Sequence, residues 1–406
     1  MITSFTQKQK AILAYSGGLD TTVLVPWLKE QGVAEVICAA ADVGQIADPK
    51  ALEAKALATG ADKFVLLNLR DEFISDYVFP CIQAGAKYEG VYLLGTAMAR
   101  PLIAKALVEL AHAEQTNLIV HGCTGKGNDQ VRFELTMYAL DPEIEVIAPW
   151  RFWDIKSRSE EINYVKEHGI ALEFYEDESY SMDENLWHLS HEGLDLELPS
   201  SAADLDKILK WVTPPEKAPD QSEEITITFV KGIPVAIDGE ELKPAEIVSK
   251  LNAIGGKHGI GIDDIVENRL VGMKSRGVYE NPAGTILYFA HEKLESITLD
   301  VDTLHFKQPL AYRIADLVYN GKWESNLYKA LQAFVASTQE RVNGSVKLKL
   351  YKGQVYVQEL HSADSLFSEE HATFEHAESY DHADATGFIK LYGLATKIQA
   401  QLQVKK

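Results

Sequence analysis

The sequence predicts an α/β domain with a parallel sheet, followed by an α+β domain and a C-terminal helix. Three observations support this order. Short apolar segments alternate with helical segments over about the first 170 residues. Two later segments have the pattern of β-hairpins, with helical segments between them. The residues of Phe388–Lys406 carry apolar side chains at spacings of three and four, which is typical of a helix with one apolar face.

Five short apolar segments are expected to form the parallel sheet. They are Lys10–Tyr15, Glu35–Asp42, Lys63–Leu69, Asn117–His121 and Glu145–Trp150. Strands that alternate with helices pair in parallel and are covered by helices on both faces. Ligands of such sheets bind on the loops that follow the carboxyl ends of the strands. We therefore expect the functional site on those loops.

Helices are expected between these strands, each with a recognisable start or end signal. The segment Asp20–Gln31 is helical in pattern, and Pro26 inside it should kink the helix or shift its start. Asp48-Pro49 is a favoured helix start, and Gly60 is expected to end that helix. Further helices are expected from about Asn128 and from Ser157 to Gly169.

The pattern changes after about residue 170. Glu224–Asp238 and Ser345–Glu359 are each predicted to form a hairpin. We expect three parts: residues 1–170 as a first domain, 171–385 as a second domain and 386–406 as a terminal helix. Periodicity leaves open whether that helix packs on its own domain or on another subunit.

The charge balance argues against a nucleic-acid-binding protein. The 406 residues include 39 basic and 60 acidic side chains, a formal net charge of −21, whereas nucleic-acid binding needs basic patches. The three cysteines, Cys38, Cys81 and Cys123, form no C-x-x-C pair. They indicate neither a zinc site nor a disulfide framework, and we expect no resident metal.

No apolar run is long enough to span a bilayer, so no membrane association is expected. Residues 1–10 lack the apolar core of a signal peptide. We therefore expect a cytoplasmic protein.

The first motif that points to chemistry is Ser16-Gly17-Gly18-Leu19-Asp20-Thr21-Thr22, between the first strand and its helix. A helix N-terminus offers free N–H groups and a partial positive charge. The two glycines allow the backbone to approach an anion closely, and three hydroxyls add donors. The motif therefore predicts a phosphate cradle. It is neither a Walker loop nor a dinucleotide fingerprint. Asp20 is open to two interpretations: a helix cap, or a group that orients the loop or Mg²⁺.

The second motif, His121–Glu134, repeats the order of strand, glycine-rich loop and helix. Asn128, Asp129 and Arg132 crowd the first helical turn, where residues four apart share a face. A guanidinium in that position can hold a carboxylate in a bidentate fork. Cys123 has no base paired with it in any motif, so we expect a buried apolar role rather than a nucleophile.

Together these motifs resemble a known family. Ser-Gly-Gly-Leu-Asp-Thr resembles the loop of the PP-loop ATP pyrophosphatases, which cleave ATP to AMP and pyrophosphate. Combined with Thr-Gly-Lys-Gly-Asn-Asp-Gln-Val-Arg-Phe-Glu, it resembles the argininosuccinate synthase family. The segments Ser181–Ser190, Asp264–Tyr279 and Asp384–Ile389 agree, so the resemblance covers about residues 10–390.

The resemblance implies a PP-loop nucleotide-binding domain followed by a synthetase domain, and a reaction that joins L-citrulline to L-aspartate. ATP with Mg²⁺ would adenylate the citrulline ureido oxygen, and the aspartate amine would then displace AMP. It implies catalytic roles for Asp20, Asp129 and Arg132. The ATP contacts would be Ala14, Tyr15, Ser16, Gly17, Gly18, Leu19, Asp20, Thr21, Thr22, Ala41 and Gly122. Aspartate would contact Thr124, Asn128 and Asp129. Citrulline would contact Tyr92, Asn128, Arg132, Ser181, Ser190, Glu267 and Tyr279.

The resemblance also implies a homotetramer to which the terminal helix contributes. One departure concerns Ala97, where many relatives have a serine assigned to citrulline; either Thr96 takes this role or the contact is dispensable. Two alternatives stay open. One is another adenylating enzyme, such as an NAD or GMP synthetase or a tRNA-modifying enzyme. The other is a nucleotide-binding regulator without turnover. The absence of a glutaminase Cys–His motif and of basic patches opposes the first, and the amino-acid pocket opposes the second.

Overall fold

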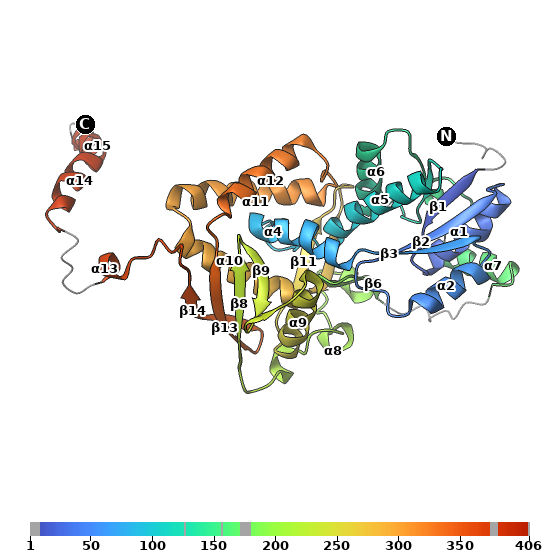
Figure 1. Ribbon diagram of the computed structural model, residues 1–406, viewed down its shortest axis with the longest axis horizontal. Coiled ribbons are helices and arrows are strands. Elements are labelled where there is room, and N and C mark those ends of the chain that lie inside the picture. Colours follow the sequence, from blue (N-terminus) through green and yellow to red (C-terminus); the bar gives the residue numbers. More distant parts are fainter. Residues whose placement is uncertain (1–8, 126, 156, 171–179, 374–380, 405–406) are drawn as a thin grey trace. The chain divides into compact units, whose positions relative to one another are not determined.

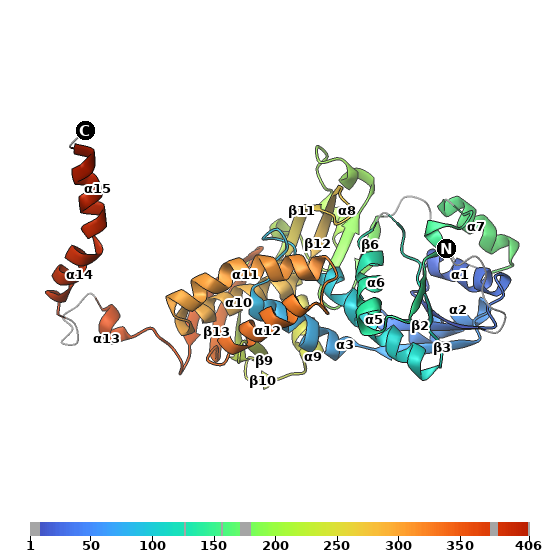
Figure 2. The same ribbon diagram turned by 90° about the horizontal axis from the view of Figure 1, so that it is seen from above.

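The computed structural model describes residues 9–125, 127–155, 157–170, 180–373 and 381–404. The N-terminal segment considered above for a signal peptide lies largely outside these residues, as does Lys126 of the second motif. The chain divides into two compact units, one ending at Asp364 and one comprising Ser365–Lys406. Figure 1 and Figure 2 show the elements in two views.

A five-stranded sheet forms the first part of the larger unit, with all strands parallel in the order β3-β2-β1-β4-β5. The strands are β1 (Lys10–Ala14), β2 (Glu35–Asp42), β3 (Lys63–Asn68), β4 (Leu118–Val120) and β5 (Glu145–Ile147). Each of the five strands lies within one of the segments predicted from the apolar runs. Ile12 of β1 is in register with Ile37 and Ile119 on its two neighbours, so β1 lies in the middle of the sheet.

Helices cover both faces because successive residues of a strand point to opposite sides. Ile12 packs in the core that includes the apolar side chains of α5 (Gly95–Ala113) and α6 (Asp129–Leu140). The next residue, Leu13, packs in a separate core with α1 (Leu19–Glu30) and α7 (Arg158–Glu167). Figure 2 shows these helices around the sheet. The parallel-sheet prediction is confirmed.

The helix starts follow the capping signals. The Asp48 side chain accepts hydrogen bonds from the backbone N–H groups of Lys50 and Ala51, both at 3.0 Å, and so begins α2 (Pro49–Ala58). Ser157 and Glu160 form a capping box at the start of α7. Pro26 does not shift the start of α1, which begins at Leu19 and runs through the proline.

Helices between β3 and β4 were not anticipated from the sequence. They are α3 (Arg70–Glu72), the π-helix η1 (Phe73–Val78), α4 (Phe79–Ala84) and the long α5. Most of η1, α4 and α5 is buried, so these helices lack the polar face that gives a helical sequence its period.

The second part of the larger unit contains two antiparallel sheets. One has the order β11-β12-β7-β6, with β6 (Ser181–Glu184), β7 (Leu189–Glu192), β11 (Ile262–Asn268) and β12 (Lys274–Glu280). The other has the order β10-β9-β8-β13-β14, with β8 (Glu223–Val230), β9 (Ile233–Ile237), β10 (Glu240–Glu241), β13 (Gly344–Tyr351) and β14 (Gln354–His361). The two predicted hairpins are β8–β9 and β13–β14.

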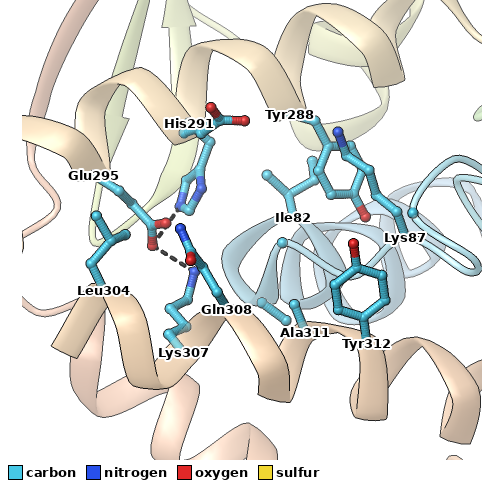
Figure 3. A pocket seen from close by; sticks show the side chains of 14 residues that line it. Ile82, Lys87, Tyr288, His291, Glu295, Leu304, Lys307, Gln308, Ala311 and Tyr312 are labelled. Carbon is cyan, nitrogen blue, oxygen red and sulfur yellow. Dashed lines mark hydrogen bonds and ion pairs between the residues drawn. The ribbon is translucent and has the colours of Figure 1, made fainter. Parts of the chain in front are cut away.

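This part also contains four long helices: α9 (Pro244–Lys257), α10 (Pro282–Thr298), α11 (Val301–Tyr319) and α12 (Asn326–Thr338). The helices α9 and α10 contact the sheet that contains β9 and β13, whereas α11 and α12 pack against each other and against α4. The shorter helical segments are η2 (Pro149–Arg151), η3 (Leu194–Glu197), α8 (Leu205–Ile208) and η4 (Pro215–Lys217). A cavity of about 350 Å³ lies between α10 and α11, with Lys87, Tyr288, Lys307 and Tyr312 among its lining residues (Figure 3).

The smaller unit contains α13 (Glu369–Ala372), α14 (Asp384–Tyr392) and α15 (Leu394–Val404). The prediction of a single terminal helix from Phe388 onward is therefore wrong, because the helix is interrupted at Gly393, between α14 and α15. Its apolar side chains are exposed, Leu391 at 79% and Leu402 at 60%. Among the described residues, no helix has the length and apolar character needed to cross a membrane.

Candidate active site

The two glycine-rich loops follow neighbouring strands at the centre of the parallel sheet. From β1 the chain continues to β2 on one side, whereas β4, on the other side of β1, is followed by β5. Such a reversal of direction is where open α/β sheets bind ligands. The loops are in contact: a Cβ added to Gly122 would lie 3.3 Å from Cγ2 of Thr21. The prediction that both motifs lie at strand ends is confirmed.

The first loop is held in shape by its own hydroxyls. Gly17 has φ +76°, which favours glycine, and a Cβ there would lie 2.4 Å from Cδ1 of Leu52. Ser16 Oγ accepts a hydrogen bond from the Gly18 N–H at 3.3 Å, and Thr22 Oγ1 donates to the Gly18 carbonyl at 2.7 Å. The first turn of α1 begins directly after this loop, as a phosphate cradle requires.

A lysine that no motif indicated lies against this loop. Lys55, on α2, donates a hydrogen bond from Nζ to the Gly17 carbonyl at 2.5 Å. Burial lowers the pKa of Lys55. It adds a cation to a loop whose own residues supply none, and its position in the middle of α2 gave no sequence signal.

The second loop leads into a chain of charged groups on α6, α5 and β6. Arg100 donates from Nε to Oδ2 of Asp129 at 2.8 Å and from Nη2 to Oδ2 of Asp183 at 2.7 Å. Arg132 donates from Nη1 to Oδ1 of Asp129 at 3.0 Å. Asp129 is therefore held between two guanidinium groups. Arg100 and Asp183 complete the chain. Asp183 lies within the segment Ser181–Ser190, but neither side chain was predicted to belong to the site.

This surrounding fixes the protonation of two groups. Burial by itself would raise the pKa of Asp129, but Arg100 and Arg132 outweigh it and lower the pKa, so the carboxylate stays ionised. Burial raises the pKa of the Cys123 thiol well above its ordinary value. The thiol is protonated at neutral pH, which agrees with the expectation that Cys123 is not a nucleophile.

A second cluster joins α6 to the antiparallel sheet through Glu267. Its Oε1 accepts a hydrogen bond from the Tyr279 hydroxyl at 3.2 Å, and its Oε2 accepts one from the Tyr319 hydroxyl at 2.8 Å. Tyr319 in turn accepts a hydrogen bond from Nδ2 of Asn128 at 2.9 Å. Tyr92 packs against the ring of Tyr279, with centroids 5.0 Å apart. Four residues expected to contact citrulline thus lie together.

The remaining expected contacts differ in how they are held. Ser190 is the register partner of Tyr279, and its hydroxyl donates to the Asp183 carbonyl at 3.3 Å. Ser181 and Thr124 are exposed. Ala41 lies near the carboxyl end of β2. Ala97 is fully buried in α5. The neighbouring hydroxyl, Thr96 Oγ1, donates to Oδ2 of Asp183 at 2.8 Å, so it is already engaged by the protein.

Family models match both parts of the chain. The model described as the arginosuccinate synthase N-terminal HUP domain matches residues 10–171, and that of the C-terminal domain matches residues 180–399. The chain belongs to the argininosuccinate synthase family. Membership confirms the resemblance derived from the motifs. It also confirms the fold class, in which the PP-loop domain with its parallel sheet precedes an antiparallel-sheet domain and terminal helices.

Curated relatives agree over their whole length. Argininosuccinate synthase of Acetivibrio thermocellus is 56% identical, covering 98% of this chain and 99% of the relative. The enzyme of Moorella thermoacetica is 55% identical over 99% and 98%, and that of Carboxydothermus hydrogenoformans is 55% identical over 97% and 98%. The function is that of the argininosuccinate synthase family, an ATP-dependent ligase, as the motifs predicted.

Proposed function

We propose that the chain activates L-citrulline with ATP and condenses the product with L-aspartate, through the residues described above. The ureido oxygen of citrulline attacks the α-phosphorus of ATP, and pyrophosphate leaves. The aspartate amine then attacks the activated carbon, AMP leaves, and argininosuccinate forms. The polar network that joins Asp129, Arg132, Asn128 and Glu267 carries this proposal. Its residues Asn128 and Asp129 directly follow the second glycine-rich loop, which contacts the first loop.

Citrulline, a zwitterion, needs an anion for its ammonium group and a cation for its carboxylate. Glu267 supplies the first and Arg132 the second. Burial raises the pKa of Glu267, whereas the Tyr319 hydroxyl and Arg132 act in the opposite direction. The contacts assigned to Tyr92, Asn128, Ser181, Ser190 and Tyr279 orient the rest of the molecule. Thr96 is not assigned a citrulline contact, because its hydroxyl is bound to Asp183.

The ATP phosphates bind the cradle formed by residues 14–22, with Ala41 and Gly122 completing the nucleotide contacts. Mg²⁺ enters with ATP as part of the substrate, and Asp20 is the carboxylate of this loop that orients the loop or the ion. Lys55 supports the loop from α2. The rate arises mainly from positioning the reacting atoms and from stabilising charge on the phosphates.

Aspartate binds beside Thr124, Asn128 and Asp129. A carboxylate next to a dianionic substrate would repel it, but Arg100 and Arg132 offset the charge of Asp129. Asp129 is then a hydrogen-bond acceptor for the attacking amine. Arg132 therefore contributes to both substrate sites, to citrulline directly and to aspartate through Asp129.

The exposed apolar side chains of α14 and α15 support a homotetramer in which these helices pack on other subunits. Leu391, Leu394, Ile398 and Leu402 are all half or more exposed, or close to it, and such a surface is ordinarily covered in solution. Light scattering after size exclusion would test this by comparing the wild type with a Leu391→Glu, Leu402→Glu double variant. A cytoplasmic location is part of the same proposal.

A turnover assay tests the proposed reaction. ATP, Mg²⁺, citrulline and aspartate are supplied together, pyrophosphate is followed, and argininosuccinate is sought by mass. The expected result is that pyrophosphate and argininosuccinate form together. Continued release of pyrophosphate without argininosuccinate, although aspartate is present, would keep the first half-reaction but overturn the assignment of aspartate as the second nucleophile. Release of orthophosphate in place of pyrophosphate would overturn the chemistry.

A further inference from the structure

Tyr319 is a buried residue at the point where the two halves of the site meet. It is the last residue of α11 and is 0% exposed. It belongs to none of the motifs that the sequence shows. Nevertheless it contacts three residues with assigned substrate roles, Asn128, Arg132 and Glu267.

The hydroxyl of Tyr319 can be oriented in only one way. A carboxylate such as Glu267 accepts hydrogen bonds, so the Tyr319 O–H must point to its Oε2. The oxygen of Tyr319 then offers lone pairs to Asn128, which must answer with its NH₂ group. This fixes the orientation of the Asn128 amide, which the covalent structure of asparagine leaves free to flip.

The consequence appears on the other side of the same amide. Asn128 is 7% exposed, and its Oδ1 is a buried oxygen without a hydrogen-bond partner in the described part of the chain. A buried acceptor left unpaired is costly. An N–H donor of a bound substrate would satisfy it.

Tyr319 also holds the neighbouring arginine. Its carbonyl accepts a hydrogen bond from Nε of Arg132 at 3.0 Å, and the guanidinium lies over its ring, 4.8 Å from the centroid. The ring of Tyr319 also stacks on the ring of Tyr88, with centroids 3.6 Å apart. Gly321 permits this approach, because a Cβ there would lie 2.8 Å from Cα of Arg132.

We propose that Tyr319 is a positioning residue that presents Oδ1 of Asn128 to N–H groups of the substrates and holds Glu267 and Arg132 in place around citrulline. This inference rests on the proposed function. The hydroxyl acts through Asn128 and Glu267, and the backbone carbonyl and ring act through Arg132. The pocket therefore selects a ligand with an N–H donor at Asn128, as the ureido group and the amine provide.

Tyr319→Phe removes one oxygen and keeps the ring and the carbonyl. We expect the KM for citrulline to rise by about tenfold or more, because the variant loses a hydrogen bond to a charged group. The KM is measured by citrulline-dependent pyrophosphate–ATP exchange. Tyr288→Phe is the matched control: its buried hydroxyl donates to the Ala86 carbonyl at 2.6 Å, away from the site, and its KM should equal that of the wild type.

The pH profile separates positioning from a general loss of structure. The charged or titratable groups that face Glu267 are Tyr88, Tyr92, Arg132, Glu192, Arg269, Tyr279 and Tyr319. Among these, the Tyr319 hydroxyl lowers the pKa of Glu267, so its removal should move the acid limb of kcat/KM for citrulline to higher pH. Tyr319→Phe should also add little to the KM of an Asn128→Ala variant, since both changes remove one interaction.

The outcomes are distinct. A Tyr319→Phe enzyme with a citrulline KM within twofold of the wild type and an unchanged pH profile would overturn the positioning role. If that variant does not fold, Asn128→Asp takes its place: it keeps an acceptor but cannot donate to Tyr319, so the KM should still rise, and an unchanged KM would again overturn the role. A wild type that makes no argininosuccinate would instead overturn the proposed function and the inference with it.

Discussion

Oδ2 of Asp129 accepts a hydrogen bond from Nε of Arg100 at 2.8 Å. The other oxygen of the carboxylate accepts one from Arg132. The carboxylate proposed to accept a hydrogen bond from the aspartate amine therefore also offsets the positive charge of two guanidinium groups, one buried and one partly buried. Removing its side chain would disturb the citrulline site through Arg132, whereas an isosteric amide would change mainly the charge.

We expect Asp129→Asn to retain citrulline-dependent pyrophosphate–ATP exchange to within several-fold and to lower argininosuccinate formation by about 100-fold, equivalent to roughly 2.7 kcal/mol. The reason is that the amide is a weaker acceptor for the attacking amine and no longer balances both arginines. Arg100→Lys serves as a comparison that keeps the charge. An equal loss of exchange and of product would contradict the assignment of Asp129 to the second step.

Gly17→Ala should raise the KM for ATP by about tenfold while the protein stays folded. The residue has φ +76°, and the added methyl would meet Leu52, so the strain of about 1–3 kcal/mol distorts the cradle. Gly32→Ala is the control, because Gly32 has φ +90° with no atom within 4 Å of an added Cβ. Both variants should lose similar stability in urea, but only Gly17→Ala should affect ATP; an unchanged KM would remove Gly17 from the nucleotide site.

Lys307→Met should destabilise the protein by about 3–5 kcal/mol, since it leaves the buried Glu295 carboxylate without its cation, although the hydrogen bond from Gln339 at 2.7 Å remains. Lys307 is 3% exposed and lies 2.7 Å from Oε1 of Glu295, and Figure 3 shows the two side chains pointing toward each other from α11 and α10. Lys217→Met, at an exposed ion pair with Asp206, should cause no measurable loss. Equal midpoints in guanidinium unfolding for the two variants would show that the Lys307 pair does not stabilise the fold.

His188 should make the fold less stable in mild acid. Burial lowers the pKa of His188 to about 4, with Arg100 and Arg132 acting in the same direction and Asp183 and Asp129 against it. The unfolded chain has the ordinary value near 6.5 and binds the proton more readily. The stabilisation is therefore complete above about pH 6.5 and is lost as the pH falls toward 4, by ~3 kcal/mol in total. Urea unfolding of the wild type and of His188→Gln between pH 7.5 and 4.5 would measure this; identical slopes would exclude the contribution.

The parallel sheet could be predicted because each strand is an apolar run bounded by polar or glycine residues, as in Glu35–Asp42. The helices from Arg70 to Ala113 could not, because burial on nearly all sides removes their periodicity. The terminal helix was predicted to be continuous because its apolar spacing continues across Gly393. The helix itself is interrupted there, which the spacing does not show.

The site divides in the same way. Motif residues such as Asn128, Asp129 and Arg132 were indicated because they crowd one loop and one helical turn. Tyr319 was not, because its importance depends on a contact with a residue 191 positions away in the chain. Arg100, Asp183 and Lys55 likewise acquire their roles only through tertiary contacts.

The start of α6 brings Asn128, Asp129 and Arg132 within four positions of one another, and they are assigned to two different substrates. Redesign of the enzyme for another acceptor amine is therefore constrained, because residues for both substrates lie in the same helical turn. A substitution in this turn that favours the new amine would also affect the binding of citrulline. A productive library would vary this turn together with position 319, so that the two specificities can change in step.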